Sequence, residues 1–560
     1  MEQRINTKSY YRLMFLIALT GYIFSVLYNL GYTELDGEEP RRALISIEML
    51  NSGNFIVPTL YGWEYYNKPP LYNWILSAFM YITQSTKELV VRLPSLVFLL
   101  IWGFFHFIFT KKFFSTSIAL LSAVFLITGG ELYFYGLQNG GEMDIFYAFI
   151  VYLQVISLFY FFEKKNWLLL FVFSYLFCAI GFLTKAFPSV LFQGLTLLSL
   201  VLYARSFRIL WKWQHLVGIL VFLALMASYF YAYNLYSSPQ HFLVNLLNES
   251  IRKTPLSEES GNFWENIVNY PVRMFTGLLP WSLIPFLLFL NKPKPSFWSN
   301  PLLRFSILFI LCNIWVYWFF GVVKLRYSYM FYPFMTLFFA VIFDHYRRFI
   351  NTNKLLKYLG FAFILFLIAT LIIPFYFRFE IAPFILVVLF LAFFIYKFFK
   401  TQTDRIWLFA AVIIIVRFAY ASLYMPIMDE NRKSTKYRIP LKQAATFANN
   451  DTLRFYAKPD TLPLSVDLKF VTIGKEYALV PPEIFKQVPY YYYQATGKLV
   501  LMDSVIKNDR LYFSYLPFLS NTSSVNELFR FYDSRMQSDF ILFKGNKNSQ
   551  RQVKTIIKKN

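Results

Sequence analysis

Residues 167–204 read WLLLFVFSYLFCAIGFLTKAFPSVLFQGLTLLSLVLYA, and this stretch decides the fold class of the chain. It contains two apolar runs, 167–184 and 187–204, with a polar break at Lys185 between them. Each run approaches the roughly 20 apolar residues that a helix needs to cross the hydrocarbon of a bilayer. Arg205 ends the second run with a positive charge. The stretch therefore predicts two successive membrane spans.

The composition of the whole chain agrees with this prediction. Of its 560 residues, 57% are hydrophobic and 15% are charged, and the mean hydropathy is +0.45. Soluble domains do not have this composition, so a soluble enzyme, a disordered tail and a fibre are excluded. Cys178 and Cys312 both lie inside apolar runs, so they offer neither a disulfide framework nor a zinc cluster.

The net charge points to the membrane as well. Lys and Arg number 54 against 31 Asp and Glu, which leaves a charge of +23. In a soluble protein this excess would suggest nucleic acid, but in a membrane protein cationic cytoplasmic loops and pockets for anionic lipids come first. We expect membrane lipids, and no nucleic acid, among the partners.

Apolar runs with charged borders predict thirteen spans and one further apolar helix. The stretch Leu71 to Ile82 is too short to cross a bilayer easily, so we interpret it as an interfacial helix. The first run lacks a small-residue cleavage site and is expected to stay as an anchor. The predicted spans are about 11–31, 92–110, 116–135, 144–162, 167–184, 187–204, 214–236, 272–290, 303–322, 327–344, 356–376, 380–399 and 405–424.

Charge at the span borders predicts the topology. A cytoplasmic N-terminus puts the cationic loops inside, as the positive-inside rule requires. Because the number of spans is odd, residues 425–560 then lie outside as a separate polar domain. Runs at 468–473 and 510–515 predict strands in it, so we expect a small mixed α/β domain. Residues 1–424 form the membrane domain, with long outer loops at 32–91 and 237–271.

Two outer loops carry the candidate catalytic carboxylates. In the first loop Glu34, Asp36, Glu38 and Glu39 precede Arg41 and Arg42. Neighbouring carboxylates raise the pKa of a carboxyl group and nearby arginines lower it. The balance of the two effects suits a base that works near neutral pH. An acidic turn that caps the helix starting near Pro40 is the alternative. In the next loop Asp144 stands at the mouth of an apolar run, where it could also be a helix cap.

Cations on the outer side depart from the positive-inside trend. They need an anionic partner, and a phosphate or pyrophosphate is the natural one. Snorkelling to lipid head groups explains one or two of them better than it explains all seven. These residues are Arg41, Lys68, Arg92, Lys185, Arg252, Lys324 and Arg326.

The first loop resembles a known family. Its motifs are the acidic pair followed by Arg, Ser52-Gly-Asn-Phe-Ile-Val-Pro58 and Tyr66-Asn-Lys-Pro-Pro70. They are similar to those of the bacterial members of the protein O-mannosyltransferase superfamily, especially the lipid A aminoarabinose transferases. Further matches lie at Val91-Arg-Leu-Pro-Ser95, Met143-Asp144, Thr184-Lys185, Glu249, Tyr270-Pro271, Leu279-Pro-Trp281 and the segment after Lys324.

The resemblance covers residues 10–345 and implies a fold and an activity. It implies a glycosyltransferase of the GT-C fold in the bacterial inner membrane, with about thirteen spans and a periplasmic C-terminal domain. Such enzymes pass a sugar from a polyprenyl-phosphate carrier to a lipid, glycan or protein acceptor with inversion. By position, the first catalytic acid falls on Glu38, with Asp36 and Glu39 beside it, and the second on Asp144. The implied contacts to carrier phosphate and sugar are Arg41, Lys68, Arg92, Lys185, Glu249, Arg252, Lys324, Arg326 and Tyr327.

Two departures from the family pattern concern a metal. Asn67 and Ser250 stand where the aminoarabinose enzymes carry residues that resemble a metal-binding pair. With four histidines in the chain and no His cluster, we expect no required cofactor, although a divalent metal stays open. Two other functions also stay open: a flippase or transporter for an anionic lipid-linked sugar, and a ligase that moves a whole glycan.

Overall fold

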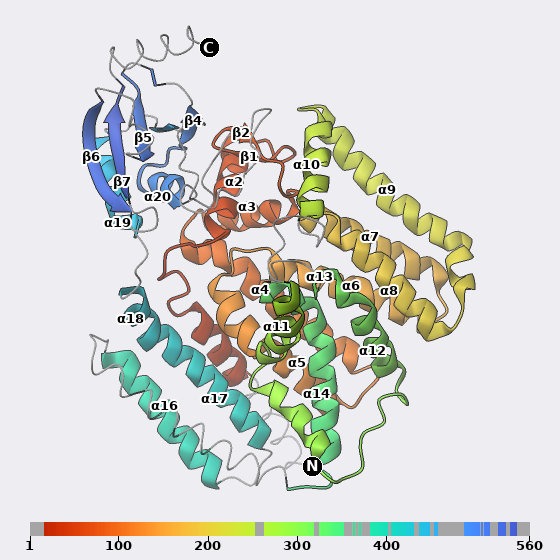
Figure 1. The fold of residues 1–560 in the computed structure, drawn as a ribbon. Helices are drawn as coiled ribbons and strands as arrows, with labels where there is room; N and C mark the ends of the chain where they lie inside the picture. The colour runs from red at the N-terminus through yellow and green to blue at the C-terminus, as the bar shows by residue number, and fades with distance from the viewer. Residues whose placement is uncertain are drawn as a thin grey trace.

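The computed structural model describes a mostly helical chain (Figure 1). The described residues are 16–252, 263–318, 324–351, 381–400, 405–430, 436–448, 453–456, 487–503, 506–507, 509–515, 525–533 and 538–545, with single positions between 361 and 371.

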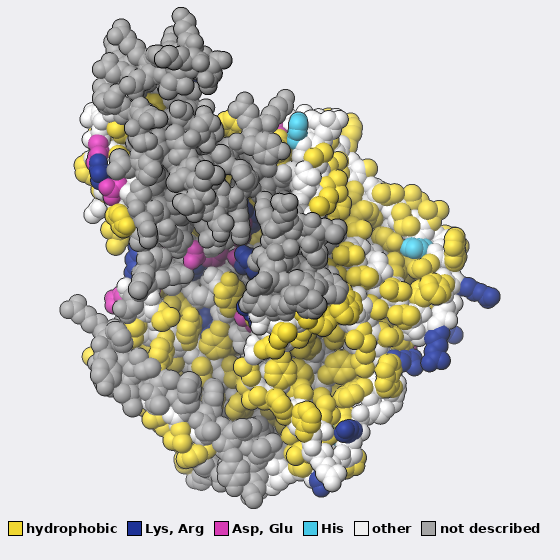
Figure 2. Space-filling view, in the orientation of Figure 1, with side chains coloured by type: hydrophobic (Ala, Val, Ile, Leu, Met, Phe, Trp, Pro, Cys, Tyr) yellow, Lys and Arg dark blue, Asp and Glu magenta, His cyan; other side chains and the backbone are white. Residues whose placement is uncertain are grey.

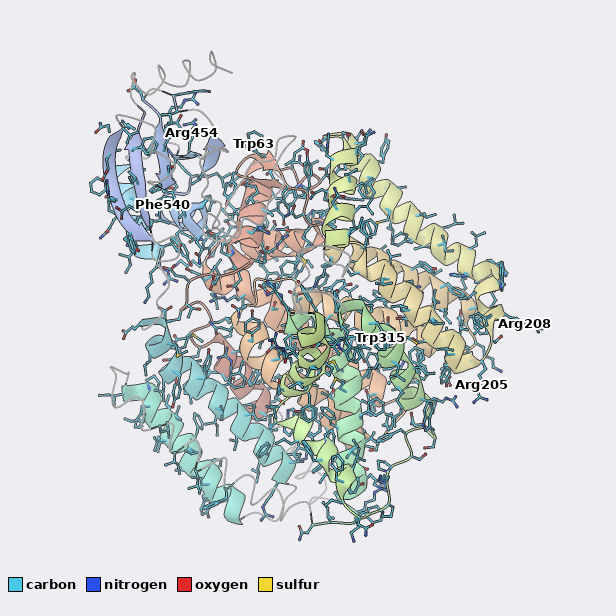
Figure 3. All side chains as sticks on the ribbon, viewed as in Figure 1. Trp63, Arg205, Arg208, Trp315, Arg454 and Phe540 are labelled. Carbon is cyan, nitrogen blue, oxygen red and sulfur yellow. The ribbon has the colours of Figure 1, made fainter. Side chains whose placement is uncertain are left out.

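The membrane domain is a bundle of apolar helices. After an apolar helix at Leu16–Leu27, its main helices are α4 (Glu88–Thr110), α5 (Thr116–Ile127), α6 (Asp144–Glu163), α7 (Trp167–Lys185), α8 (Pro188–Ala204), α9 (Trp213–Asn234), α12 (Pro301–Asn313), α13 (Trp315–Trp318), α14 (Tyr332–Tyr346), α16 (Ile381–Lys400) and α17 (Arg405–Ala419). Hydrophobic side chains cover much of its described surface in Figure 2. Figure 3 places Arg205 and Arg208 at the edge of this bundle, away from the sheet that carries Arg454 and Phe540.

The predicted spans coincide with helices wherever the structure describes them. Among the described residues, seven helices are long and apolar enough to cross a membrane. Four other predicted spans fall on shorter apolar helices, and the span 356–376 lies outside the described residues apart from single positions. The chain is thus a multi-pass membrane protein, and the count of thirteen stays a prediction.

One predicted span differs from the expected straight helix. The segment predicted at 272–290 is a bent pair, Ile267–Thr276 and Trp281–Phe289, with an angle of 106° between its halves. Pro280 lies at the break, and a proline ring clashes with the preceding turn of a continuing helix. Hydropathy alone cannot distinguish such a broken span from a straight one.

The first loop, residues 32–91, is built from two helices and a hairpin. Helix α2 (Glu39–Ser52) ends at Gly53, whose φ of 70° is the left-handed conformation that glycine favours at helix ends. Strands β1 (Thr59–Leu60) and β2 (Trp63–Glu64) pair antiparallel, and α3 (Leu71–Thr83) follows. The expected helix at Leu71 to Ile82 is therefore present, and its place at the membrane interface stays a prediction.

The C-terminal segment forms the expected mixed α/β domain. Its elements are α19 (Arg438–Phe447), β3 (Leu453–Tyr456), α20 (Gln487–Thr496), β4 (Leu501–Asp503), β5 (Leu511–Tyr515), β6 (Asn526–Asp533) and β7 (Ser538–Lys544). The strand order is β4-β3-β5-β7-β6, with β3 parallel to both neighbours and β7 antiparallel to both of its own. The strand predicted at 510–515 is β5, and the one predicted at 468–473 lies outside the described residues. In Figure 1 this domain stands beside α2 and α3.

Candidate active site

The loop before α6 is packed too tightly for side chains at its two glycines. A Cβ on Gly140 would lie 2.9 Å from the backbone oxygen of Arg92, and one on Gly141 would lie 2.7 Å from Val91 Cγ1. Real Cβ atoms essentially never approach other atoms this closely. The two glycines therefore let the loop pack closely against α4. This packing fixes the position of Asp144, where α6 begins.

Hydrogen bonds hold the same loop from three sides. Tyr72 Oη and Ser95 Oγ both donate to the carbonyl of Gly140, over 3.1 Å and 2.5 Å. The amide of Gly141 donates to Glu39 Oε1 over 3.0 Å. Because α2, α3 and α4 each supply one partner, the loop has little freedom to move independently of them.

Glu39 and Arg92 form a buried ion pair under the loop. Arg92 Nη2 lies 2.8 Å from Glu39 Oε2, and Arg92 Nε donates to Glu39 Oε1 over 3.0 Å; both side chains are at most 1% exposed. Arg92 Nη1 also donates to the carbonyls of Leu30 and Thr33. Because these donors already bond groups of the protein, Arg92 is placed to hold the loops together rather than to face a phosphate. Glu39, expected among the catalytic carboxylates, is likewise fully buried.

Asp144 stands between two cations from distant parts of the chain. Its Oδ1 lies 2.5 Å from Lys185 Nζ at the end of α7, and its Oδ2 lies 3.1 Å from Arg326 Nε in η4 (Leu325–Phe331). Arg326 Nη1 also pairs with Glu142. The four side chains are between 9% and 11% exposed. The fold thus brings three predicted site residues, Asp144, Lys185 and Arg326, together with Glu142. We call these four residues the acid–cation cluster.

Lys185 is held in an aromatic enclosure. Its Nζ lies 5.0 Å from the ring centroid of Tyr147, 5.8 Å from that of Tyr317 and 4.3 Å from that of Tyr327. Cation–π attraction of this kind is worth up to about 2 kcal/mol in a desolvated site. The next residue, Ala186, has φ 62° and ψ −136°, a strained backbone for a residue with a side chain. The enclosure and the turn fix Lys185 beside Asp144.

Glu142 is a site residue that the sequence analysis did not single out. Burial raises its pKa to about 8 even though Arg326 opposes the shift, and Asp144, Glu38 and Glu39 add to it. A carboxyl group with such a pKa exchanges protons close to neutral pH. The signal in the sequence was its place two residues before Asp144 in Gly-Gly-Glu-Met-Asp.

Glu38 approaches the cluster from the first loop. Its Oε2 accepts a 2.7 Å hydrogen bond from Arg41 Nη1, and its side chain is 33% exposed. A Cβ on the preceding Gly37 would lie 3.5 Å from Glu142 Oε1, so this turn rests directly on Glu142. Asp36 Oδ1 accepts a hydrogen bond from the amide of Gly37, which stabilises the turn, but among the described residues no side chain caps the start of α2 through a hydrogen bond.

The remaining predicted residues lie around this centre or outside the described side chains. Lys68 is partly buried and Lys324 is exposed at the start of η4. Asn67 Oδ1 accepts a 3.1 Å hydrogen bond from Asn245 in α10 (Pro239–Arg252), so the first loop and the segment 237–252 meet there. The side chains of Glu249, Ser250 and Arg252 are outside the described part. In the described residues no group of three His, Cys, Asp or Glu side chains gathers as metal ligands, and the question of a metal stays open.

Comparisons with known proteins match this fold. Residues 67–231 match the family model described as dolichyl-phosphate-mannose-protein mannosyltransferase. An uncharacterized protein of Aquifex aeolicus (strain VF5) is 26% identical over an alignment of 459 residues that covers 79% of this chain and 84% of that protein. The crystal structure of ArnT from Cupriavidus metallidurans bound to undecaprenyl phosphate gives a TM-score of 0.66 at 15% identity, and covers 95% of this chain and 98% of its own. The apo state of the same protein also gives 0.66, at 13% identity over 96% and 98%.

The chain therefore has the fold of the GT-C membrane glycosyltransferases. In residues 67–231 it is similar to the dolichyl-phosphate-mannose-protein mannosyltransferase family, and in fold it is similar to ArnT; these are the families that the motifs of the first loop resemble.

Proposed function

We propose that the protein transfers a sugar from a polyprenyl-phosphate carrier to a lipid, glycan or protein acceptor on the outer face of the membrane, with inversion at the anomeric carbon. The observation that carries this proposal is the acid–cation cluster beneath the Glu38 turn. It joins cations that can take a phosphate to carboxyl groups that can take a proton. The solved relative with undecaprenyl phosphate bound has the same fold, which supports a carrier of this kind.

The cations of the cluster suit a departing phosphate. Transfer leaves the carrier as an anion, and positioned donors that meet developing charge lower the barrier. Arg326 offers a guanidinium fork and Lys185 a point charge, and both are nearly buried. Lys324 is exposed two residues before Arg326 and adds a third cation. We propose that these three residues receive the carrier phosphate.

Glu38 is the proposed base for the acceptor hydroxyl. Both oxygens of Asp144 contact cations, so we propose that Asp144 positions Lys185 and Arg326. Glu39 is held in its buried ion pair with Arg92. Glu38 is more exposed than either, with 33% of its side chain accessible. A positioned base contributes about 10²–10⁴ in rate.

A transporter or flippase for an anionic lipid-linked sugar is the alternative. Proton-relay carboxylates of a transporter should lie along a path through the midplane of the membrane. In this protein Asp144 begins α6, Lys185 ends α7 and Arg326 precedes α14, so the charges gather where the helices begin or end. This arrangement favours transfer.

The experiment is transfer by the purified protein from a panel of polyprenyl-phosphate sugars, scored by loss of the carrier-linked sugar. We expect the wild type to consume one donor, and Glu38→Gln and Asp144→Asn to lower the rate by at least about 100-fold. Glu163→Gln is the matched control, because Glu163 ends the same helix that Asp144 begins. Full activity of both site variants would refute the assignment, and donor that crosses a liposome bilayer without being consumed would establish transport instead.

A further inference from the structure

The C-terminal domain contacts the first outer loop immediately before Glu38. Leu35, three residues earlier, is fully buried in an apolar core to which both parts contribute. Tyr490 and Tyr491 of α20 lie in the same core. The domain therefore touches the segment 32–36, which leads directly into the turn that carries the proposed base.

Glu34 is bound by the beginning of α19. Its Oε2 accepts a 2.9 Å hydrogen bond from the amide of Tyr437, and its Oε1 accepts a 2.8 Å bond from the amide of Arg438. Unsatisfied amides at a helix start attract a carboxylate, and each such bond is charge-assisted. The guanidinium of Arg438 reaches back to Glu88 over 2.7 Å and to the carbonyl of Tyr32 over 3.3 Å.

Helix α20 binds the backbone on both sides of Leu35. The amide of Leu35 donates to Tyr491 Oη over 2.8 Å, and its carbonyl accepts from Gln487 Nε2 over 2.7 Å. Backbone groups are normally satisfied within a strand or helix. The backbone of Leu35 is instead satisfied by side chains of the C-terminal domain. These side chains lie more than 450 positions away along the chain.

The inner side of the same segment is fixed by the membrane domain. Arg92 donates to the carbonyl of Thr33 over 3.1 Å and to that of Glu34 over 3.2 Å, while it holds Glu39. Residues 33–35 thus lie between Arg92 on one side and α19 and α20 on the other. Removing the outer contacts would leave the segment with one anchored side.

We propose that the C-terminal domain is a positioning clamp for the proposed base: through Glu34, Gln487 and Tyr491 it sets the place of the Glu38 turn above the acid–cation cluster. The inference rests on the proposed function for its catalytic consequence. It gives this domain a role within the site itself, because a shift of about 1 Å in a reacting group can lower a rate by about 100-fold.

Two conservative variants test the clamp. Tyr491→Phe removes the hydroxyl that binds the amide of Leu35, and Glu34→Gln keeps the shape while it loses one of two acceptors. We expect kcat with the carrier-linked sugar that the wild type consumes to fall about 10-fold, while the KM for that donor changes less than about 2-fold. Amide hydrogen exchange over residues 32–39 should be about 3- to 10-fold faster in both variants.

Tyr493→Phe is the matched control, since it removes a hydroxyl from the same helix. Among the described contacts, Tyr493 makes no hydrogen bond to the first loop. A kcat within 2-fold of wild type in both variants, or an equal loss in Tyr493→Phe, would overturn the clamp. If no donor is consumed even by the wild type, the proposed function fails, and the exchange rates over 32–39 still decide whether the domain holds the loop.

Discussion

In the proposed function, Glu142 and the donor phosphate compete for the same guanidinium. Arg326 contacts Glu142 through Nη1 and Asp144 through Nε, so a phosphate must displace at least one carboxylate to be gripped by the fork. With a pKa of about 8, Glu142 is mainly protonated at pH 7 and leaves Arg326 available. Above that pH it becomes an anion and competes.

This competition predicts a pH dependence. Between pH 7 and 9 the protonated fraction of Glu142 falls about 10-fold, so the KM for donor should rise by about that factor. Glu142→Gln cannot ionise and should keep a flat KM over the same range. The measurement is donor KM from pH 6 to 10 for both proteins; an equal rise in the variant would show that another group titrates.

The glycine pair makes a second prediction at the residue scale. A methyl group at Gly141 meets Val91 Cγ1 at 2.7 Å and Glu39 Cβ at 3.0 Å, so Gly141→Ala should destabilise the protein by about 1–3 kcal/mol. Gly194 in α8 has no atom within 4 Å of an added Cβ, and Gly194→Ala should be neutral or stabilising by up to about 1 kcal/mol. Thermal unfolding of both variants in detergent checks the contrast. Equal melting temperatures of Gly141→Ala and Gly194→Ala would mean that the loop before α6 shifts to accommodate the added methyl group.

At the scale of elements, the turn between α7 and α8 determines where Lys185 sits. Ala186 has a positive φ that a β-branched residue adopts only at a high energy. Ala186→Val should therefore cost about 1–3 kcal/mol and raise the KM for donor by displacing Lys185, whereas Ala186→Gly should keep both properties. Ala224→Val, on an exposed position of α9, is the control. Unchanged stability and KM in Ala186→Val would show that the turn relaxes without moving Lys185.

The helices and their contacts also show which features of the fold the sequence could predict. Hydropathy located the helices, because membrane burial acts on each run separately. The departure of Lys185 from the positive-inside trend pointed to the candidate site, because the charge at a span border can also be read from each run separately. Contacts such as Glu39 with Arg92, 53 positions apart, and Glu34 with Tyr437, 403 apart, depend on tertiary packing and could not be predicted. The bend between Thr276 and Trp281 was missed because both halves are apolar.

At the scale of the whole molecule, the site lies where three parts of the chain converge. The first loop supplies Glu38, and the ends of membrane helices supply Asp144, Lys185 and Arg326. The C-terminal domain contacts the first loop on the side opposite Arg92. A carrier with a long apolar tail fits this arrangement, since its phosphate would reach the cluster while its tail stays among the exposed apolar helices. Phosphate and tail should then contribute separately to binding.

Carrier binding gives the last prediction. Undecaprenyl phosphate should raise the melting temperature of the purified protein, because a ligand that binds only the folded state stabilises it by about 2.7 kcal/mol at 100 times its Kd. Arg326→Lys keeps the charge and loses the fork, so its Kd should be about 10-fold weaker. Undecaprenol, which has the tail without the phosphate, and inorganic phosphate, which has no tail, should each stabilise less than the carrier. If undecaprenol stabilised as well as undecaprenyl phosphate, the cations of the cluster would not be the carrier's anchor, and the assignment of Lys185 and Arg326 to its phosphate would be wrong.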